Sequence, residues 1–153
     1  MADWASTERI EAVIAMAEQV EVAGQLHLQG RVAHHDGPET PLEMLNRADP
    51  FFPITLGNGH IAFVAKSQVA VVACVPSVLP TDPERMGAAK TIALEVVMAG
   101  GAEFQGSAAL ELPPTKARTL DYLNAAGRFF TLESAEATRY INRTHVRIVR
   151  PLD

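Results

Sequence analysis

The chain has 153 residues, of which 48% are hydrophobic and 20% charged, and its formal net charge is −5. These values are typical of a globular protein and exclude a disordered or fibrous chain. The single cysteine, Cys74, cannot form an intrachain disulfide, and its apolar surroundings favour a buried, inert thiol. Because the start lacks a basic segment and no apolar run is long enough to cross a bilayer, we expect a cytoplasmic protein without a membrane partner.

A short motif occurs twice, at residues 42–52 and 120–130. Each copy has leucine, an acidic residue, a bulky apolar residue, leucine, asparagine, a gap of four residues and two phenylalanines. The other aligned pairs are 6–30 with 82–106, at an offset of 76, and 63–72 with 140–149, at an offset of 77. This self-similarity predicts a duplication with a first repeat over 6–76, a linker over 77–81 and a second repeat over 82–153.

Each repeat is expected to begin with a helix. In the first, Ile10, Val13 and Ile14 have helical spacing and predict a helix near 7–18. In the second, a cap residue, a proline and a glutamate predict a shorter helix over 82–89. The strands expected after these helices are 19–23, 25–35, 52–56, 60–65 and 69–75 in the first repeat, and 91–98, 102–112, 129–133, 138–142 and 146–150 in the second. The last two strands of each repeat are expected to form a hairpin, joined at 66–68 and at 143–145. The repeated motif itself is expected to contain a short turn of helix or strand.

Glycines predict the bends between these strands. Gly24 and Gly100-Gly101 indicate turns, Gly57-Asn58-Gly59 indicates a hairpin, and Gly30 and Gly106 inside strands indicate bulges or sharp corners. Short, strongly bent strands of this kind are typical of small barrels. The predicted fold is therefore mainly β with short helices (α+β): two tandem small Sm-like or SH3-like β-barrels, each with one helix and about five strands.

Residues 140–149 resemble the second signature of Sm proteins, in which an apolar strand, a short polar turn and another apolar strand pair with the next subunit. Residues 120–124 fall where the first Sm signature would lie. The resemblance implies that Asn124, Asn142 and Arg143 match positions that hold bases and phosphates in RNA-binding members. It also implies assembly of subunits through strand edges.

The sequence departs from the Sm pattern at the polar turn, where Arg143 precedes threonine instead of glycine. The first repeat has Asn46, Ala65 and Lys66 at the three implied binding positions, so that site is weaker there. The Leu-Asn motif with its two phenylalanines, together with the run Ile-Asn-Arg-x-His, also resembles an uncharacterised family of small bacterial proteins. That second resemblance implies a fold and no activity.

The candidate binding residues are in the second repeat and are Asn124, Tyr140, Asn142, Arg143, His145 and Arg147. Residues 116–153 hold seven basic and four acidic side chains, although the whole chain is acidic. In the functional interpretation, arginines contact phosphates and an aromatic ring stacks on a base. In the alternative interpretation, the polar turn around Arg143 and His145 is a solvated hairpin tip without a ligand, and Asn46 and Asn124 only hydrogen-bond their own turns.

Two pairs of adjacent aromatic residues are candidate interface residues: Phe51 with Phe52, and Phe129 with Phe130. Neighbouring strand residues point to opposite faces of a sheet. If one phenylalanine of a pair fills the core, the other must therefore contact a helix, the other repeat or another chain.

The sequence contains none of the usual catalytic, nucleotide-binding or zinc-binding motifs. Residue types that can bind a metal gather only in the first repeat, at His34, His35 and Asp36, with His27 and His60 elsewhere. Neighbouring His34 and His35 would face opposite sides of a strand, so only one could join a shared site. We predict no enzyme, no cofactor and no metal, with metal binding by these histidines left open.

These observations favour a non-catalytic binding or assembly module that is oligomeric through strand edges and exposed aromatic residues. Its expected partner is a second copy of the chain or another protein. The alternative is an Sm-like RNA-binding protein that uses the basic second repeat. Its weakness is the overall acidity of the chain, since nucleic-acid binding requires a basic face.

Overall fold

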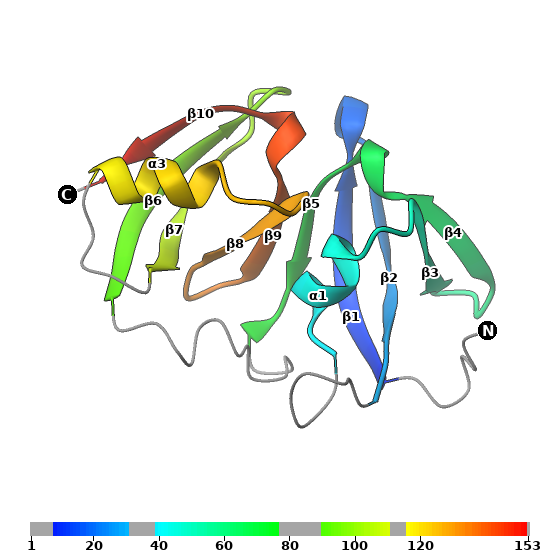
Figure 1. Ribbon diagram of the computed structural model, residues 1–153. Coiled ribbons are helices and arrows are strands. Elements are labelled where there is room, and N and C mark those ends of the chain that lie inside the picture. Colours follow the sequence, from blue (N-terminus) through cyan, green and yellow to red (C-terminus); the bar gives the residue numbers. More distant parts are fainter. Residues whose placement is uncertain (1–7, 31–38, 77–89, 111–115, 153) are drawn as a thin grey trace.

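The computed structural model describes residues 8–30, 39–76, 90–110 and 116–152. In this part of the chain, ten strands form one antiparallel sheet and two short helices lie against it (Figure 1). The strands are β1 (Glu8–Met16), β2 (Glu21–Leu28), β3 (Phe51–Leu56), β4 (Ile61–Ala65), β5 (Val69–Cys74), β6 (Lys90–Met98), β7 (Glu103–Leu110), β8 (Phe129–Glu133), β9 (Thr138–Asn142) and β10 (Val146–Pro151). The helices are α1 (Pro41–Asn46) and α3 (Lys116–Leu123), with 3₁₀ turns η2 (Ala17–Gln19), η3 (Lys66–Gln68) and η5 (Arg143–His145). Neither helix has the length and apolar character that a bilayer span requires.

The strands follow the order β10-β6-β7-β8-β9-β5-β1-β2-β3-β4 across the sheet. We call residues 8–76 the first half and residues 90–152 the second half. Each half has its fifth strand next to its first, followed by its second, third and fourth strands. The halves meet where β9, the fourth strand of the second half, pairs with β5, the fifth strand of the first.

The prediction of a mainly β fold is confirmed, but the two predicted barrels are not closed, because the described strands form a single open sheet. Each half could close only by using the edges of its own fourth and fifth strands. Instead, β5 and β9 hydrogen-bond to each other, and β4 and β10 remain at the two ends of the sheet. The sheet carries two hydrophobic clusters, and each includes residues of both halves. Phe129 and Tyr140 pack in the cluster of the first half, and Val71 packs in that of the second.

The helix expected near residues 7–18 is also wrong, since residues 8–16 form the strand β1. Ile10, Ala12 and Ile14 are buried, whereas Val13, which completed the helical spacing, is exposed. Alternate burial is the pattern of a strand with one face in the core. Because β1 pairs with β2 and β5, tertiary pairing decides its conformation. The helix expected over 82–89 and the linker over 77–81 lie outside the described residues.

The second strand of the first half also differs from expectation, whereas β7 of the second half lies within the expected 102–112 and follows the turn predicted at Gly100 and Gly101. Residues 21–28 form one strand, with Gly24 in its middle instead of at a turn, and Gly30 follows the strand. A Cβ on Gly24 would lie 2.9 Å from the Thr55 carbonyl oxygen, and one on Gly106 would lie 2.4 Å from the Glu133 carbonyl oxygen. Both glycines therefore allow the second strand to approach the third closely. Glu8 pairs with Leu28 in the first half as Lys90 pairs with Leu110 in the second. The first two strands of the two halves therefore correspond at an offset of 82 residues, and the offset of 76 expected from the sequence is wrong for these strands.

The repeated motif forms a helix end, a turn and a strand in both halves, so of the two predicted possibilities for its first part, helix or strand, the structure has the helix. In the first half, Thr40 caps α1: its hydroxyl accepts from the Glu43 amide at 3.2 Å, and Glu43 Oε1 accepts from the Thr40 amide at 2.8 Å. Pro41 occupies the first turn, where no intrahelical donor is needed.

The strand limits predicted on either side of η3 and η5 are confirmed within one residue, and β3 pairs with β4 as the glycines at 57 and 59 predict. The hairpins predicted for 60–65 with 69–75 and for 138–142 with 146–150 are wrong, because β5 pairs with β1 and β9, and β10 pairs with β6. The 3₁₀ turns η3 and η5 therefore lead the chain to a different part of the sheet.

Candidate assembly interface

The contact between the halves, which we call the junction, is built on the pairing of β5 with β9. Val71 lies opposite Ile141, Val72 opposite Tyr140, and Cys74 opposite Thr138. All six side chains are buried, and the strand amides and carbonyls hydrogen-bond to one another across the junction. Strand pairing and apolar burial therefore both hold the halves together.

Asn46 adds a polar contact to the junction. This residue ends α1 in the first half, and its side-chain Nδ2 donates to the Phe129 carbonyl oxygen at 3.1 Å. The Phe129 amide donates back to Asn46 Oδ1 at 2.8 Å. The side chain thus hydrogen-bonds the main chain of the other half, which the sequence interpretation as a local turn residue missed. An asparagine in the same place of both motif copies was the only signal available.

A second polar contact lies beside the first, because Asn142 at the end of β9 is opposite Phe129. Asn142 is fully buried, and its Nδ2 donates to the carbonyl oxygens of Lys66 and Val69 at 3.3 and 2.9 Å. Its Oδ1 accepts from the Thr144 amide and hydroxyl. His145 Nε2 lies 2.8 Å from the Ser67 carbonyl oxygen, also across the junction. Two of the predicted binding residues therefore join the halves to each other.

Arg143 holds the loop after α3 in place. Its guanidinium donates to the carbonyl oxygens of Tyr122, Leu123, Gly127 and Phe129 at 2.8 to 3.0 Å. Unpaired carbonyls at a helix end attract a cation, so this arginine stabilises the end of α3. It also lies over the Phe130 ring, with 5.3 Å between the guanidinium carbon and the ring centroid.

Lys66 has the corresponding role in the first half. Its ammonium is buried and donates to the carbonyl oxygens of Met44 and Arg47 at 2.9 and 3.0 Å, at the end of α1. Burial lowers the pKa of Lys66 from its usual value, because desolvation disfavours the charged form. The sequence comparison placed Lys66 and Arg143 at a phosphate-binding position, whereas both side chains contact their own helix ends.

The remaining predicted binding residues do not gather with these at one surface. Tyr140 is buried in the core cluster of the first half. Arg147 donates to the Ala99 carbonyl oxygen, and the neighbouring Arg150 forms an ion pair of 2.6 Å with Glu95. Asn124 is exposed at the end of α3.

The four phenylalanines of the motif have three different environments. Phe52 and Phe130 fill the clusters of their own halves. Phe129 points the other way and packs in the cluster of the first half. Phe51, at the corresponding position in the first half, is exposed.

Four pairs of corresponding residues show the same contrast in the exposed fraction of their side chains. At the junction, Phe129 is 1% exposed, Tyr140 3%, Val71 3% and Leu42 9%. At the ends of the sheet, the corresponding values are 56% for Phe51, 64% for Phe63, 45% for Ile148 and 58% for Leu120. We call β4 with Phe51 and Phe63 the β4 edge, and β10 with Ile148, Leu120 and Asn124 the β10 edge. Sequence analysis did not identify Leu120, Phe63 and Ile148 as interface residues. Phe63 and Ile148 could have been identified as large apolar residues in the last two strands of their repeats.

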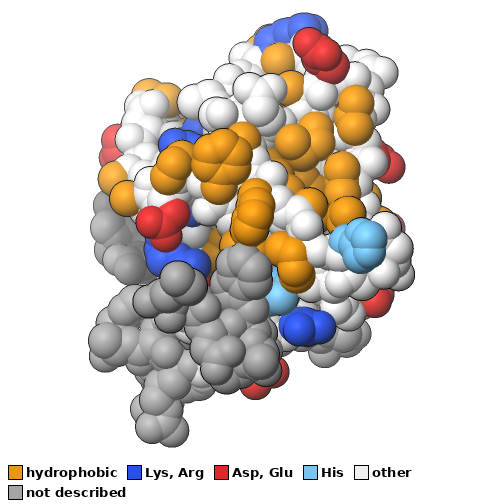
Figure 2. All heavy atoms as spheres, turned by 90° about the vertical axis from the view of Figure 1, so that its right-hand side faces the viewer, with side chains coloured by type: hydrophobic (Ala, Val, Ile, Leu, Met, Phe, Trp, Pro, Cys, Tyr) orange, Lys and Arg blue, Asp and Glu red, His pale blue; other side chains and the backbone are white. Residues whose placement is uncertain are grey.

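Hydrophobic side chains gather on the side of the molecule where β3 and β4 lie (Figure 2). Phe51, Ile61 and Phe63 are among the exposed large apolar residues of this part of the sheet. A contiguous exposed apolar surface of this kind is typical of an interaction site. Its position at a sheet edge adds main-chain donors and acceptors to the apolar surface.

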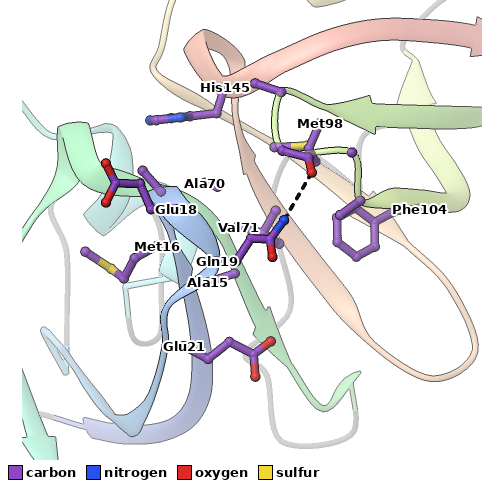
Figure 3. A pocket seen from close by; sticks show the side chains of 15 residues that line it. Ala15, Met16, Glu18, Gln19, Glu21, Ala70, Val71, Met98, Phe104 and His145 are labelled. Carbon is purple, nitrogen blue, oxygen red and sulfur yellow. Dashed lines mark hydrogen bonds between the residues drawn. The ribbon is translucent and has the colours of Figure 1, made fainter.

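A cleft of about 880 Å³ opens between the halves, between the β1–β2 and β6–β7 turns (Figure 3). Gln19 Nε2 crosses it and donates to the Gly100 carbonyl oxygen at 3.3 Å. Phe104 and Met98 line one side, and His145 and Glu18 lie at its rim. Among the described residues that line the cleft, Glu18, Glu21 and His145 are the ones with ionisable side chains.

The histidines that sequence analysis considered for a metal are only partly described, since His34, His35 and Asp36 lie outside the described residues. His27 is buried, with Nε2 2.7 Å from the Thr55 hydroxyl. Within the described residues, no group of three or more metal-binding side chains occurs. Cys74 is buried in β5, and desolvation raises the pKa of its thiol to about 12, as expected for an inert residue.

Comparison of the chain with protein-family models, with curated proteins and with solved structures finds no match.

Proposed function

We propose that this chain is a non-catalytic assembly module that oligomerises through the β4 and β10 edges of its sheet. The observation that supports this proposal is the junction, where the fourth strand of one half pairs with the fifth strand of the other. The remaining fourth and fifth strands, β4 and β10, end the sheet and carry large exposed apolar residues. An unpaired sheet edge next to apolar side chains favours addition of another strand.

We further propose that the two halves are tandem repeats of one small, Sm-like β unit that share a continuous sheet. Three observations support this interpretation. The halves have the same strand order. Gly24 and Gly106 lie at the same place in the second strand, each against the backbone of the third. Lys66 and Arg143 both stabilise the end of their own half's helix.

The molecular mass in solution tests the proposed function. We expect light scattering to give a mass above that of one chain and to rise with protein concentration. Phe51→Asp places a charge in the proposed contact and should shift the protein towards the monomer. Val20→Asp is the matched control, because Val20 is also 56% exposed but lies at the β1–β2 turn. A wild-type chain that stays monomeric at high concentration would contradict the proposal.

The ratio of absorbance at 260 and 280 nm on the same peak tests the alternative, RNA binding by the second half. Bound RNA would raise this ratio and would dissociate steeply with increasing salt, because phosphate contacts release counterions. Assembly through apolar strand edges should depend little on salt. The side chains of Asn142 and Arg143 are bound to main-chain groups inside the protein, so the assembly proposal is the better supported.

A further inference from the structure

Asn124 occupies the same place in the second half as Asn46 in the first, at the end of the helix in the repeated motif. Asn46 makes two hydrogen bonds to the main chain of Phe129 across the junction. Asn124 is exposed, and its main-chain amide donates to the Leu120 carbonyl oxygen at 3.0 Å, whereas its side-chain amide makes no hydrogen bond to another described residue. The second half therefore has the asparagine that corresponds to Asn46, but in the part of the chain that the structure describes, the main chain of a strand such as β8 is not within its reach.

The matching strand is present at the other end of the molecule. Phe51 corresponds to Phe129 in the motif and begins β3 as Phe129 begins β8. It is 56% exposed where Phe129 is 1% exposed. Because β4 and β10 lie at opposite ends of the sheet, one chain cannot bring its own Asn124 to its own Phe51.

We propose that Asn124 of one molecule binds the main chain of Phe51 in a second copy of this chain and so sets β10 against β4 in the register of the junction. Asn124 Nδ2 donates to the Phe51 carbonyl oxygen, and the Phe51 amide donates to Asn124 Oδ1, as Asn46 and Phe129 do. This inference rests on the proposed function and names both its partner and its geometry.

The register follows from the pairing of β5 with β9. At the junction, Val71 lies opposite Ile141 and Val72 lies opposite Tyr140. When each residue is replaced by its counterpart in the other half, Ile148 lies opposite Val64 and Val149 lies opposite Phe63 in the contact between molecules. At the junction, Leu42 of α1 packs where this helix contacts β8. In the contact between molecules, Leu120 of α3 packs in the same way against β3 of the second copy. Phe51, Phe63, Leu120 and Ile148, each of which is far more exposed than its counterpart at the junction, all lie in this one contact.

The contact between molecules lacks some features of the junction. Ala65 corresponds to Asn142 and cannot make the two side-chain hydrogen bonds that Asn142 donates to carbonyl oxygens. Pro151 corresponds to Cys74 and has no amide hydrogen to donate to a neighbouring strand. Asp49 stands where Gly127 lies close to the Asn46 amide, so Asn124 has less room. The association is therefore weaker than the junction and reversible. Since the contact joins two different surfaces, repeated association closes a ring or extends a filament.

Cysteine pairs test the register in the full chain. Phe63→Cys with Val149→Cys should form disulfides between molecules under mild oxidation, seen as a ladder of covalent multimers in non-reducing gels. Phe63→Cys with Ile148→Cys is the matched control, because a shift of one residue places the two side chains on opposite faces. Buried Cys74 is common to both variants, and mass spectrometry of linked peptides identifies the thiols that reacted.

Asn124→Ala tests the docking residue. It should raise the concentration for half-association about tenfold, since two hydrogen bonds are lost. The control is Asp121→Asn, an exposed change on the same helix, which should have no effect. Conversely, Ala65→Asn restores the donor that Asn142 provides at the junction and should lower this concentration by a similar factor.

The possible results separate this inference from the proposed function. Disulfides in the variant with Phe63→Cys and Val149→Cys, together with weaker association of Asn124→Ala, would support both the inference and the proposed function. An oligomer that cross-links only in the shifted pair, or that is unaffected by Asn124→Ala, would overturn the inference and leave assembly through the edges standing. A monomeric wild-type chain would overturn both.

Discussion

The junction and the two ends of the sheet contain corresponding strands in opposite situations. At the junction, β9 and β5 pair with each other, and Phe129 and Tyr140 are buried. At the ends, β4 and β10 each have a single described neighbour, and Phe51 and Phe63 are more than half exposed. The sequence motif is nearly the same in both places, so the presence of a neighbouring half decides burial.

The polar residues show where the halves differ. Asn142 and His145 make contacts across the junction, whereas the corresponding positions in the first half hold Ala65 and Gln68. The junction therefore has hydrogen bonds that the β4 edge cannot reproduce. We expect a permanent contact within the chain and a weaker one between chains, and the following changes test this difference.

The largest effect is expected from removing an aromatic ring at the junction. Phe129→Ala should lower the free energy of unfolding by about 3–5 kcal/mol, because it leaves a cavity in a closely packed cluster. Phe51→Ala, the corresponding change at the exposed position, should alter it by less than about 0.5 kcal/mol in dilute solution. Denaturant unfolding at low protein concentration measures both values. Equal losses would contradict the contrast between the two sites.

A smaller effect is expected at the two asparagines. Asn46→Ala should destabilise the chain by about 2 kcal/mol, because it removes two hydrogen bonds and leaves the Phe129 main chain without these partners. Asn124→Ala should leave the unfolding of the dilute protein unchanged, since Asn124 is exposed. If Asn124→Ala destabilised the isolated chain as much as Asn46→Ala, its proposed role between molecules would be wrong.

The smallest effect is a dependence of stability on pH that arises in the first half. Burial, and then the nearby Arg9, lower the pKa of His27 below its usual value of 6.5. The unfolded chain therefore binds a proton more readily, and the free energy of unfolding should fall as the pH decreases from 6.5 through the folded-state pKa. The second half has Ala109 at this position, since Arg9 lies opposite His27 as Thr91 lies opposite Ala109.

Unfolding measured between pH 5 and pH 8 checks this dependence on His27→Gln, in which the other titrating groups are unchanged. The slope below about pH 6.5 should be smaller in this variant than in the wild type. An equal slope in both proteins would assign the pH dependence to other groups.

The sequence by itself determined the local elements that turn residues and alternating patterns define. The strands from β3 to β5 and from β8 to β10 have limits within one residue of those predicted, because Gly57 and Gly59, the polar turns and the flanking apolar residues act within a few positions. The partners of β5 and β10 were not predicted, since both strands pair with segments far away in the chain. It also determined that Phe51 and Phe52 face opposite ways, since this follows from strand geometry alone.

Only the tertiary structure decided which of these elements meet. Residues 8–16 combine helical and alternating spacing, and pairing with β2 and β5 selects the strand. The sheet stays open because β9 pairs with β5, a contact between segments far apart in the chain. The same long-range contact gives the Asn46 side chain a partner 83 residues away, whereas the Asn124 side chain, in the same local sequence, has no hydrogen-bond partner among the described residues. Local sequence defines what a side chain can bind, and the packing of the two halves defines which side chains have a partner.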